Sequence, residues 1–255
     1  MKSNNKPLLS IVMPVRNDAE SVDVMVRVLN ALIKVSVELI VVTDNYEDTT
    51  TPVLADLSQV YPNVHHIINT ISPGVLPAVR EGVKAAKGKY VLIYAADEIC
   101  PVLAIQNMLK LMDSGCDFVS GTRYARGGNR YGGSLIGHIL SRLANTLFNL
   151  FSATALTDCT TGLKMFRREL FEKFDFSQTG SGWSFAFQMA ITAQKMGLRI
   201  AEVPIVSIDR LLGGQSTFRL IPWVISYARL FMMGVYQLPP WHSPKPFLLS
   251  PELLK

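Results

Sequence analysis

The first half of the chain alternates short apolar runs with longer stretches in which apolar residues recur at helical spacing. The apolar runs have the length and the Val/Ile/Leu content of buried strands. They cover residues 8–13, 37–42, 64–68, 90–94 and 118–121. Helical periodicity fills the intervals, at residues 19–32, from 51 onward, at 77–86 and at 102–112. This alternation predicts an α/β fold built on a parallel sheet with right-handed crossovers.

Residues that typically begin or end helices stand at the expected boundaries. Asp18 can cap the first helix. Pro52 fits the first turn of the second helix, and Asp48 is expected to cap that helix. Gly88 is a stop signal after the third helix.

Two segments of the second half are expected to form amphipathic helices. In residues 135–151 the apolar positions recur at helical spacing, and the polar positions fall together on the opposite face. Residues 220–238 are largely apolar and about long enough to cross a bilayer. Pro222 and the central Arg229 favour a helix that lies in the membrane interface instead. The alternative is that both helices belong to an ordinary core or dimer interface.

Composition limits the class of protein. The chain has 255 residues, of which 49% are hydrophobic and 18% charged, and its mean hydropathy is +0.24. These values exclude a disordered chain and allow one large α/β domain over residues 1–255 or two small ones. The three cysteines form no CxxC pair, so a reducing compartment fits better than a disulfide framework or a zinc site. The first apolar run is too short for a signal peptide, and we expect a cytoplasmic protein.

The net charge of +5 is unevenly distributed. Residues 118–157 and 210–251 contain no acid, and each stretch carries four basic residues. These two stretches therefore hold eight positive charges, and the rest of the chain has a net charge of −3. Basic and apolar character together indicate a membrane surface or a lipid phosphate and argue against nucleic acid.

Polar residues directly follow three of the predicted strands. They are Arg16, Asn17 and Asp18 after the first strand, Asp44 and Asp48 after the second, and Asp97 and Glu98 after the fourth. Ligands of such sheets bind beyond the carboxyl ends of the strands. Converging carboxylates there suggest a divalent cation and a phosphorylated ligand, although acids also cap helices at these places. No GxGxxG or GxxxxGK motif is present, which disfavours a dinucleotide enzyme or a P-loop NTPase.

Several ordered segments resemble the motifs of glycosyltransferase family 2, which has the GT-A fold. SIVMPVRND at 10–18 resembles the opening VVPxYNE, and VVTDNYEDTT at 41–50 is similar to VVDDGSxDGT. PGVLPAVREG at 73–82 resembles the GxGxAxxxG turn and keeps Gly74. AADEICP at 95–101 resembles the metal motif DADxQxP and keeps Asp97, with Ala95 and Ile99 in place of two of its polar residues.

The second half resembles the dolichyl-phosphate mannose synthase branch of that family. DFVSGTRYARGG at 117–128 is similar to DiVxGTRYxxGG, and SRLAN at 141–145 to SRxAN. DCTTGLKMFRREL at 158–170 and AEVPIVSIDRLLGGQSTFRL at 201–220 follow in that branch's order. The resemblance therefore covers about residues 8–230. Residues 239–255 form a tail outside it.

This resemblance implies a single GT-A domain with a Rossmann-like, mostly parallel sheet flanked by helices. A nucleotide-binding half would span about residues 8–121, and an acceptor half with interfacial amphipathic helices about residues 122–238. The implied reaction is the inverting transfer of a hexose from a nucleotide-sugar to a polyprenyl phosphate. It would take place at the cytoplasmic face of the membrane, with the enzyme bound peripherally.

The resemblance also assigns roles to individual residues. Asp97 would be a ligand of Mg²⁺ or Mn²⁺, and Arg123 and Arg142 would hold the acceptor phosphate, which arginine binds in a bidentate way. Asp158 would orient an arginine. The donor would be bound by Pro14, Asn17, Asp18, Asp44 and Gly74, and a C-terminal loop with Arg210, Gln215 and Ser216 would close over its diphosphate.

Departures from the family pattern keep alternatives open. Ala95, Ile99, Gln188 and Thr217 replace residues that relatives often have in their motifs. One alternative is a transferase to a glycan hydroxyl in surface-polysaccharide synthesis. Another is a non-catalytic protein that binds nucleotide-sugars. The sequence also leaves open whether the chain forms an oligomer.

Overall fold

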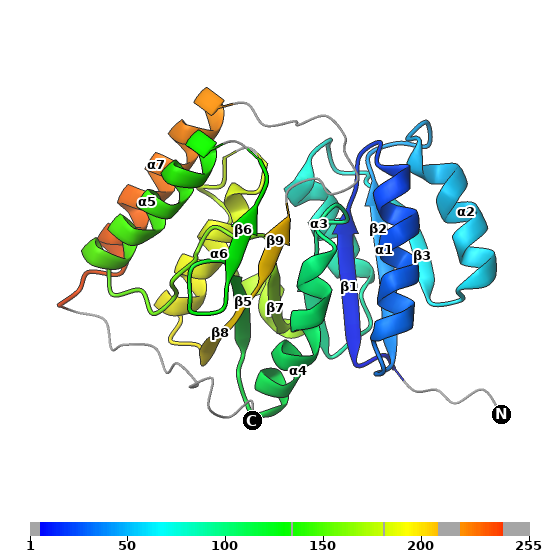
Figure 1. The fold of residues 1–255 in the computed structure, drawn as a ribbon, viewed down its shortest axis with the longest axis horizontal. Helices are drawn as coiled ribbons and strands as arrows, with labels where there is room; N and C mark the ends of the chain where they lie inside the picture. Colours follow the sequence, from blue (N-terminus) through cyan, green and yellow to red (C-terminus); the bar gives the residue numbers. More distant parts are fainter. Residues whose placement is uncertain (1–5, 134, 181, 209–219, 242–255) are drawn as a thin grey trace.

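In the computed structural model, residues 6–133, 135–180, 182–208 and 220–241 are described. A seven-stranded sheet runs through the molecule in the order β3-β2-β1-β4-β7-β5-β8 (Figure 1). Its strands are β1 (Leu9–Pro14), β2 (Val37–Thr43), β3 (Val64–Ile68), β4 (Tyr90–Ile93), β5 (Phe118–Thr122), β7 (Lys164–Arg167) and β8 (Ile200–Pro204). β6 (Asn129–Tyr131) and β9 (Val206–Ile208) form a separate parallel pair.

The sheet is mostly parallel, as the sequence predicts, and contains one antiparallel strand. The pairs β1–β2, β1–β4, β2–β3 and β5–β8 are parallel. β7 is antiparallel and inserts between β4 and β5, so these two predicted strands are not neighbours. The mostly parallel GT-A architecture is confirmed, and β7 is a strand that the sequence analysis does not predict.

Alternating side chains of each strand supply two separate cores, one on each face of the sheet. Leu9, Ile11 and Met13 of β1 point to the first face, and Val12 of the same strand points to the second. The first face is covered by α1 (Ala19–Leu32), α2 (Thr50–Val60) and α4 (Ile105–Asp113). The second is covered by α3 (Val75–Ala85), α5 (Leu135–Phe151), α6 (Ser184–Lys195) and α7 (Leu220–Gln237). The short helices are η1 (Cys100–Ala104) and η2 (Arg168–Lys173).

Some predicted helix boundaries need correction. The segment 102–112 is divided into η1, which has Pro101 in its first turn, and α4. Helix α3 begins at Val75, earlier than predicted. Asp18 precedes α1, but its side chain makes no capping hydrogen bond.

Helices α5 and α7 lie side by side at one end of the molecule (Figure 1). The buried ring of Phe148 on α5 packs edge-on against Phe231 of α7 and Phe187 of α6. A Cβ at Gly234 of α7 would lie 2.6 Å from the Phe148 ring, so only glycine allows this close approach. In the described parts of the chain, we find no helix with the length and apolarity needed to cross a membrane.

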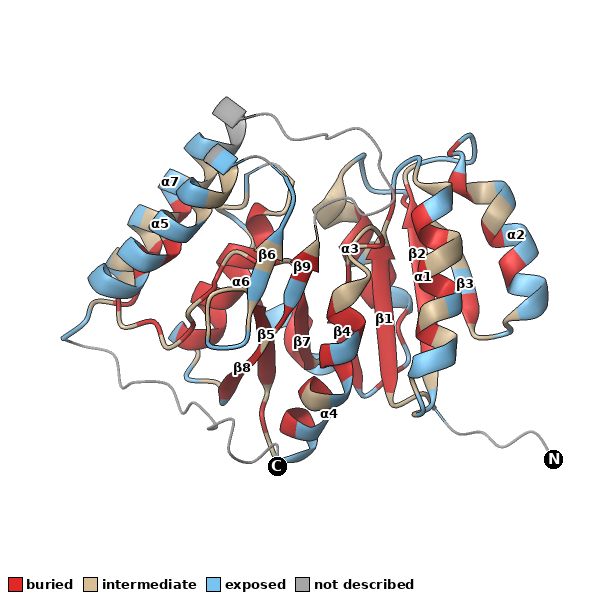
Figure 2. Cartoon of the chain, in the orientation of Figure 1, coloured by how far each residue is buried: buried red, intermediate tan, exposed pale blue. Residues whose placement is uncertain are grey.

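Helix α5 buries Phe148 and Asn145 against the protein and turns most of its other apolar side chains outward. Figure 2 shows α5 and α7 largely exposed. Leu135, Leu150 and Phe151 of α5 are 74%, 68% and 52% exposed, and Met232 of α7 is 68% exposed. The apolar stripe of α5 therefore belongs to the surface of the molecule.

Candidate active site

The turns after β1 and β2 are joined through Asn17 and Asp48. The N–H of Asn17 donates to Oδ2 of Asp48 at 2.9 Å, and the N–H of Thr49 donates to Oδ1 of Asn17 at 3.2 Å. Asn17 has a φ of 51°, a left-handed conformation that asparagine adopts more readily than most residues. Oδ1 of Asp48 accepts the N–H of Thr50 in the first turn of α2, as the sequence predicts. The backbone between Pro14, the last residue of β1, and α1 is thereby fixed.

Asp44 connects the carboxyl end of β2 to the beginning of α3. Its Oδ1 accepts from the side-chain amide of Asn69 at 2.8 Å, and both its oxygens lie 3.2 Å from the N–H of Gly74. Gly74 has a φ of 136°, which glycine adopts without strain. Asn69, which directly follows β3, is nearly fully buried and also donates to the Ser72 carbonyl. The sequence analysis did not identify Asn69 as a site residue, although its position directly after a predicted strand could have indicated it.

Asp97 and Glu98 follow β4 at the same edge of the sheet, and both are half-buried. Oε1 of Glu98 accepts the hydroxyl of Ser207 in β9 at 2.9 Å, and the Glu98 carbonyl accepts the hydroxyl of Tyr94 at 2.8 Å. Glu98 is thus anchored toward β9. Asp97 remains the carboxylate of this motif that suits a metal.

The residues present fit a divalent cation that is shared with a phosphorylated ligand. Among the described residues, no three His, Cys, Asp or Glu side chains are grouped as a metal site. Ala95 offers no oxygen, and the Ile99 side chain is apolar. Mg²⁺ is commonly held by one or two carboxylates together with substrate phosphates and waters. Asp97 therefore suffices as a protein ligand only when a diphosphate supplies further oxygens.

A buried ion pair lies beyond β5, where Arg123 meets Asp158. Nε and Nη2 of Arg123 donate to the two carboxylate oxygens at 2.7 and 3.0 Å, a bidentate arrangement. The Asp158 side chain is fully buried, and that of Arg123 is 12% exposed. Burial alone would raise the pKa of Asp158, but the charge and hydrogen bonds of Arg123 lower it below its usual value. The pair is therefore ionised at neutral pH.

The Arg123 side chain also lies within electrostatic reach of the β4 motif. Burial alone would lower the pKa of the guanidinium, but Asp158 raises it above its ordinary value, and Glu98 contributes in the same direction. In the described part of the chain, Nε and Nη2 donate to protein groups, and Nη1 has no such acceptor. A ligand phosphate near Asp97 and Glu98 could therefore be bound through Nη1.

The ring of Tyr124 lies beside two guanidinium groups. Cζ of Arg123 is 5.2 Å from the ring centroid, and Cζ of Arg142 on α5 is 6.0 Å from it. The Tyr124 hydroxyl donates to Oγ of Ser141, also on α5, at 2.8 Å. Tyr124 thereby holds α5 against the end of β5 and brings Arg142 near Arg123, a role that the sequence reading missed.

A second residue of α5 fixes the segment that carries Asp158. The amide of Asn145 donates to Oγ1 of Thr160 at 3.0 Å, and its oxygen accepts the N–H of Cys159 at 2.9 Å. The N–H groups of Thr160 and Thr161 point back to Oδ1 of Asp158. Asn145 thus fixes this segment through the N–H of Cys159 and the hydroxyl of Thr160, so its side of α5 faces the protein.

The structure brings most of the predicted site residues to one edge of the sheet. The donor-side residues Pro14, Asn17, Asp18, Asp44 and Gly74 surround the ends of β1 and β2. Asp97 follows β4, and Arg123, Arg142 and Asp158 form the neighbouring cluster beyond β5. Arg210, Gln215 and Ser216 lie outside the described residues.

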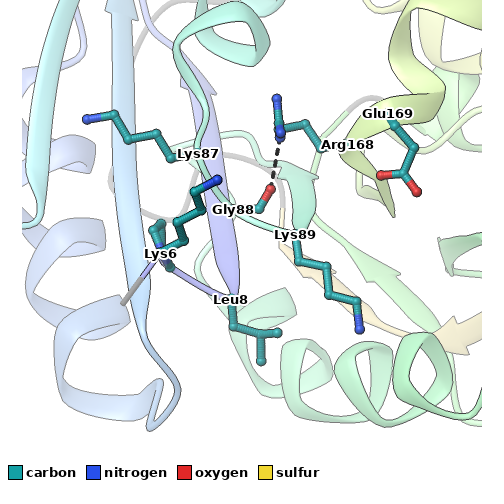
Figure 3. Close-up of a pocket in the computed structure, with 8 residues that line it drawn as sticks. Lys6, Leu8, Lys87, Gly88, Lys89, Arg168 and Glu169 are labelled. Atoms are coloured by element: carbon teal, nitrogen blue, oxygen red, sulfur yellow. Dashed lines mark hydrogen bonds between the residues drawn. The ribbon is translucent and has the colours of Figure 1, made fainter. Parts of the chain in front are cut away.

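A basic pocket at the opposite edge of the sheet does not belong to this site. Its volume is about 300 Å³, and it is lined by Lys6, Pro7, Leu8, Lys87, Gly88, Lys89, Arg168 and Glu169. Figure 3 shows Lys87 and Lys89 pointing away from each other, while Nε of Arg168 donates to the Gly88 carbonyl. Because these cations do not converge on one point, we do not assign ligand binding to this pocket in place of the site at the carboxyl ends of the strands.

Comparison with known sequences agrees with the geometry. Residues 10–175 match the sequence profile described as Glycosyl transferase family 2. A polyprenol monophosphomannose synthase of Mycolicibacterium smegmatis is 29% identical over 209 residues, which is 80% of this chain and 78% of the relative. A dolichol-phosphate mannosyltransferase of Pyrococcus furiosus is 27% identical over 77% of this chain. The match spans about half of that second relative's length, 55%.

Solved structures show the same fold at low sequence identity. Glucosyl-3-phosphoglycerate synthase from Mycobacterium tuberculosis, in complex with Mn²⁺, UDP-glucose and phosphoglyceric acid, has a TM-score of 0.65 at 17% identity. The match covers 91% of this chain and 81% of that one. A mannosyltransferase from Pyrobaculum calidifontis in complex with GDP-Man and Mn²⁺ has a TM-score of 0.63 at 20% identity, covering 98% of this chain and 69% of that one.

Proposed function

Because the chain belongs to glycosyltransferase family 2 and is therefore a glycosyltransferase, we propose that it moves a hexose from a nucleotide-sugar to a polyprenyl phosphate. The polyprenol monophosphomannose synthase to which it is similar supports this acceptor class by its name. The observation that carries the proposal is the position of Arg123 and Arg142. Arg142 lies on α5, whose apolar side chains are exposed, and Arg123 lies near it beside the Tyr124 ring. A phosphate on an apolar chain matches both features.

The reaction is a single displacement that inverts the anomeric carbon. An oxygen of the acceptor phosphate forms a bond to that carbon, and the bond to the donor diphosphate breaks with its electron pair staying on the nucleoside diphosphate. The second pKa of a phosphate monoester is about 6, so the nucleophile is already deprotonated at neutral pH. A general base is therefore not needed, and Asp158, paired with Arg123, is not available as one.

Each group of residues has a part in this reaction. The turns containing Asn17 and Asp44 bind the nucleoside, and Asp97 would hold Mg²⁺ or Mn²⁺ together with the donor diphosphate. When bound, the metal neutralises negative charge on the leaving diphosphate. Arg123, oriented by Asp158, and Arg142 hold the acceptor phosphate and aim it at the anomeric carbon.

The exposed apolar surface of α5 and α7 supports a peripheral position on the cytoplasmic face of a membrane. The surface comprises Leu135, Ile139, Leu140, Leu143, Leu147, Leu150, Phe151, Val224, Ile225, Met232 and Tyr236. Interfacial helices bury such a face at the boundary between headgroups and acyl chains. A polyprenyl phosphate reaching Arg123 would keep its hydrocarbon chain against this surface and in the bilayer.

The acceptor is tested with purified protein, radiolabelled nucleotide-hexoses and Mg²⁺ or Mn²⁺. We expect transfer to a polyprenyl phosphate and none to the matched polyprenol, which has the same chain without the phosphate. Transfer to glycan hydroxyls but not to the lipid phosphate would show the alternative transferase. Nucleotide binding without transfer from any donor would contradict an enzymatic function.

Membrane binding should depend on the apolar side of α5. Replacing both Ile139 and Leu143 with serine should lower the partition coefficient on vesicles with anionic lipids by at least about tenfold, because each side chain loses on the order of 1.5 kcal/mol of burial. Sedimentation with vesicles measures the bound fraction. The matched control is Val60→Ser on α2, also an exposed apolar residue, which should leave binding unchanged. Equal binding of the α5 variant and wild type would contradict the proposed orientation.

A further inference from the structure

Lys164 is a buried lysine that the reaction above does not use. It is the first residue of β7, in the middle of the sheet, and its exposure is 0%. Lysine usually buries its stem and keeps its ammonium group in water. Here Nζ is enclosed between β5 and the segment after α5, where it donates to Oγ of Ser120 at 2.7 Å and to the Cys159 carbonyl at 3.4 Å.

One of the two hydrogen bonds of Lys164 leads to the backbone that carries Asp158. The Cys159 carbonyl is held directly. The hydroxyl of Ser120 donates to the Gly121 carbonyl at 2.9 Å and lies 3.5 Å from the Asp158 carbonyl, so Ser120 connects Lys164 mainly to β5. The carboxylate of Asp158 in turn orients Arg123. Lys164 is therefore connected to the Arg123 guanidinium through the segment that contains Asp158 and Cys159.

In the described part of the chain, three charged groups act on Lys164. Asp158 faces it from the adjoining segment, Glu202 from β8 and Arg123 from the end of β5, while the neutral Cys159 thiol and the Phe118 ring complete the surroundings. Glu202 accepts both the N–H and the hydroxyl of Thr157, so it too holds this segment. With both carboxylates ionised and both cations charged, the cluster is neutral before a phosphate binds. Removing the charge of Lys164 would leave a net negative cluster facing an incoming dianion.

We infer that Lys164 is a positioning residue for the transfer reaction. It acts on Arg123 through Asp158, and it keeps the net charge of the buried cluster near the acceptor phosphate from becoming negative. The inference rests on the proposed function, because it assigns Arg123 to the acceptor. Lys164 itself touches neither substrate. It keeps residues 158–161 in place and balances the buried carboxylates beneath them.

The charge of Lys164 should be lost within an accessible pH range. Burial lowers its pKa to about 8, although the nearby carboxylates act in the opposite direction. In the wild type, the KM for the lipid phosphate is therefore expected to rise as the pH passes from 7 to 9. The kcat should change less, because the phosphate nucleophile stays deprotonated throughout this range.

The experiment compares Lys164→Met, Lys164→Arg and Ser120→Ala with the wild type. At pH 7, Lys164→Met should raise the KM for the lipid phosphate by about tenfold, the equivalent of one pKa unit of interaction. It should leave the Kd of the nucleoside diphosphate unchanged. Lys164→Arg should retain a low KM and keep it at pH 9, because arginine stays charged. Ser120→Ala removes only a hydroxyl and should give a smaller increase in the KM for the lipid phosphate.

Hydrogen exchange separates this inference from the proposed function. The amides of Cys159, Thr160 and Thr161 are hydrogen-bonded to side chains, and they should exchange faster in Lys164→Met and recover in Lys164→Arg. Peptides from α1 serve as the internal reference. Unchanged exchange and an unchanged KM in Lys164→Met would overturn the inference. If exchange changes but the wild type transfers no sugar to lipid phosphate, the proposed function fails and the support of residues 158–161 by Lys164 stands.

Discussion

Replacing Asp158 with asparagine is expected to lower the free energy of unfolding by about 3–5 kcal/mol, because it leaves the buried Arg123 guanidinium without a counter-charge. The two side chains are 0% and 12% exposed, so water cannot compensate for the loss. Transfer should be lost as well, since the guanidinium would no longer be held by two hydrogen bonds. Urea denaturation followed by circular dichroism measures the first effect, and a transfer assay measures the second.

The matched control is Asp117→Asn. Asp117 also accepts a hydrogen bond from an arginine, Arg167 at 2.9 Å, but its side chain is 21% exposed. We expect a cost of about 1 kcal/mol there, as for pairs in contact with solvent. A cost at Asp158 no greater than at Asp117 would show that the buried pair does not stabilise this region.

The stability difference at Asp158 should also depend on pH in a defined direction. The pKa of Asp158 is lower in the folded protein than in the unfolded chain. Its contribution is therefore fully present above the unfolded value of about 4 and is lost as the pH falls through the folded value. The difference between Asp158→Asn and the wild type should shrink in strongly acidic solution.

Replacing Asp97 with asparagine is expected to lower the rate of transfer by about 10²- to 10³-fold, the usual effect of losing one group that stabilises charge in a transition state. The fold should remain, because Asp97 is only half-buried and follows the end of β4. In addition, Mn²⁺ should bind to the wild type together with a nucleoside diphosphate and only weakly alone. Electron paramagnetic resonance of Mn²⁺ measures this binding separately from activity.

The neighbouring carboxylate provides the control for Asp97. Glu98→Gln removes the same charge one residue further on, where the side chain accepts a hydrogen bond from Ser207. We expect less than about tenfold loss of transfer and unchanged Mn²⁺ binding, since an amide oxygen can still accept that bond. Full activity of Asp97→Asn, or equal losses in the two variants, would refute Asp97 as the metal ligand.

The strands β1 to β5 and the position of the donor-side residues were predictable because they depend on local sequence. Buried parallel strands appear as continuous apolar runs, and the residues after them must lie at the carboxyl edge. Asp44 and Asp97 therefore lie at this edge, as expected from the strands that they follow. The turn-forming residues Asn17 and Gly74 were also found, because their motifs are contiguous in the chain.

The acceptor side was less predictable because its contacts join distant segments. The periodicity of α5 shows an apolar and a polar side, but it does not say which side faces the protein. The orientation of α5 depends on hydrogen bonds from distant parts of the chain, between Ser141 and Tyr124 and between Asn145 and residues 158–160. Lys164 was missed for a related reason. A lysine in a short strand is normally assigned to the surface, and only the tertiary structure supplies the oxygens that bury it.

The insertion of β7 has a consequence for the order of folding. Within the seven-stranded sheet, β5 pairs with β7 and β8 and makes no pair with β4. When the ribosome has released residues up to Thr122, β5 is outside the ribosome but its partners β7 and β8 are not. At that stage β4 also has an unpaired edge. Pairing across this distance closes a long loop, which is slow. The two halves of the sequence are thus one kinetic unit, and the nascent chain must keep an apolar strand unpaired until β7 emerges.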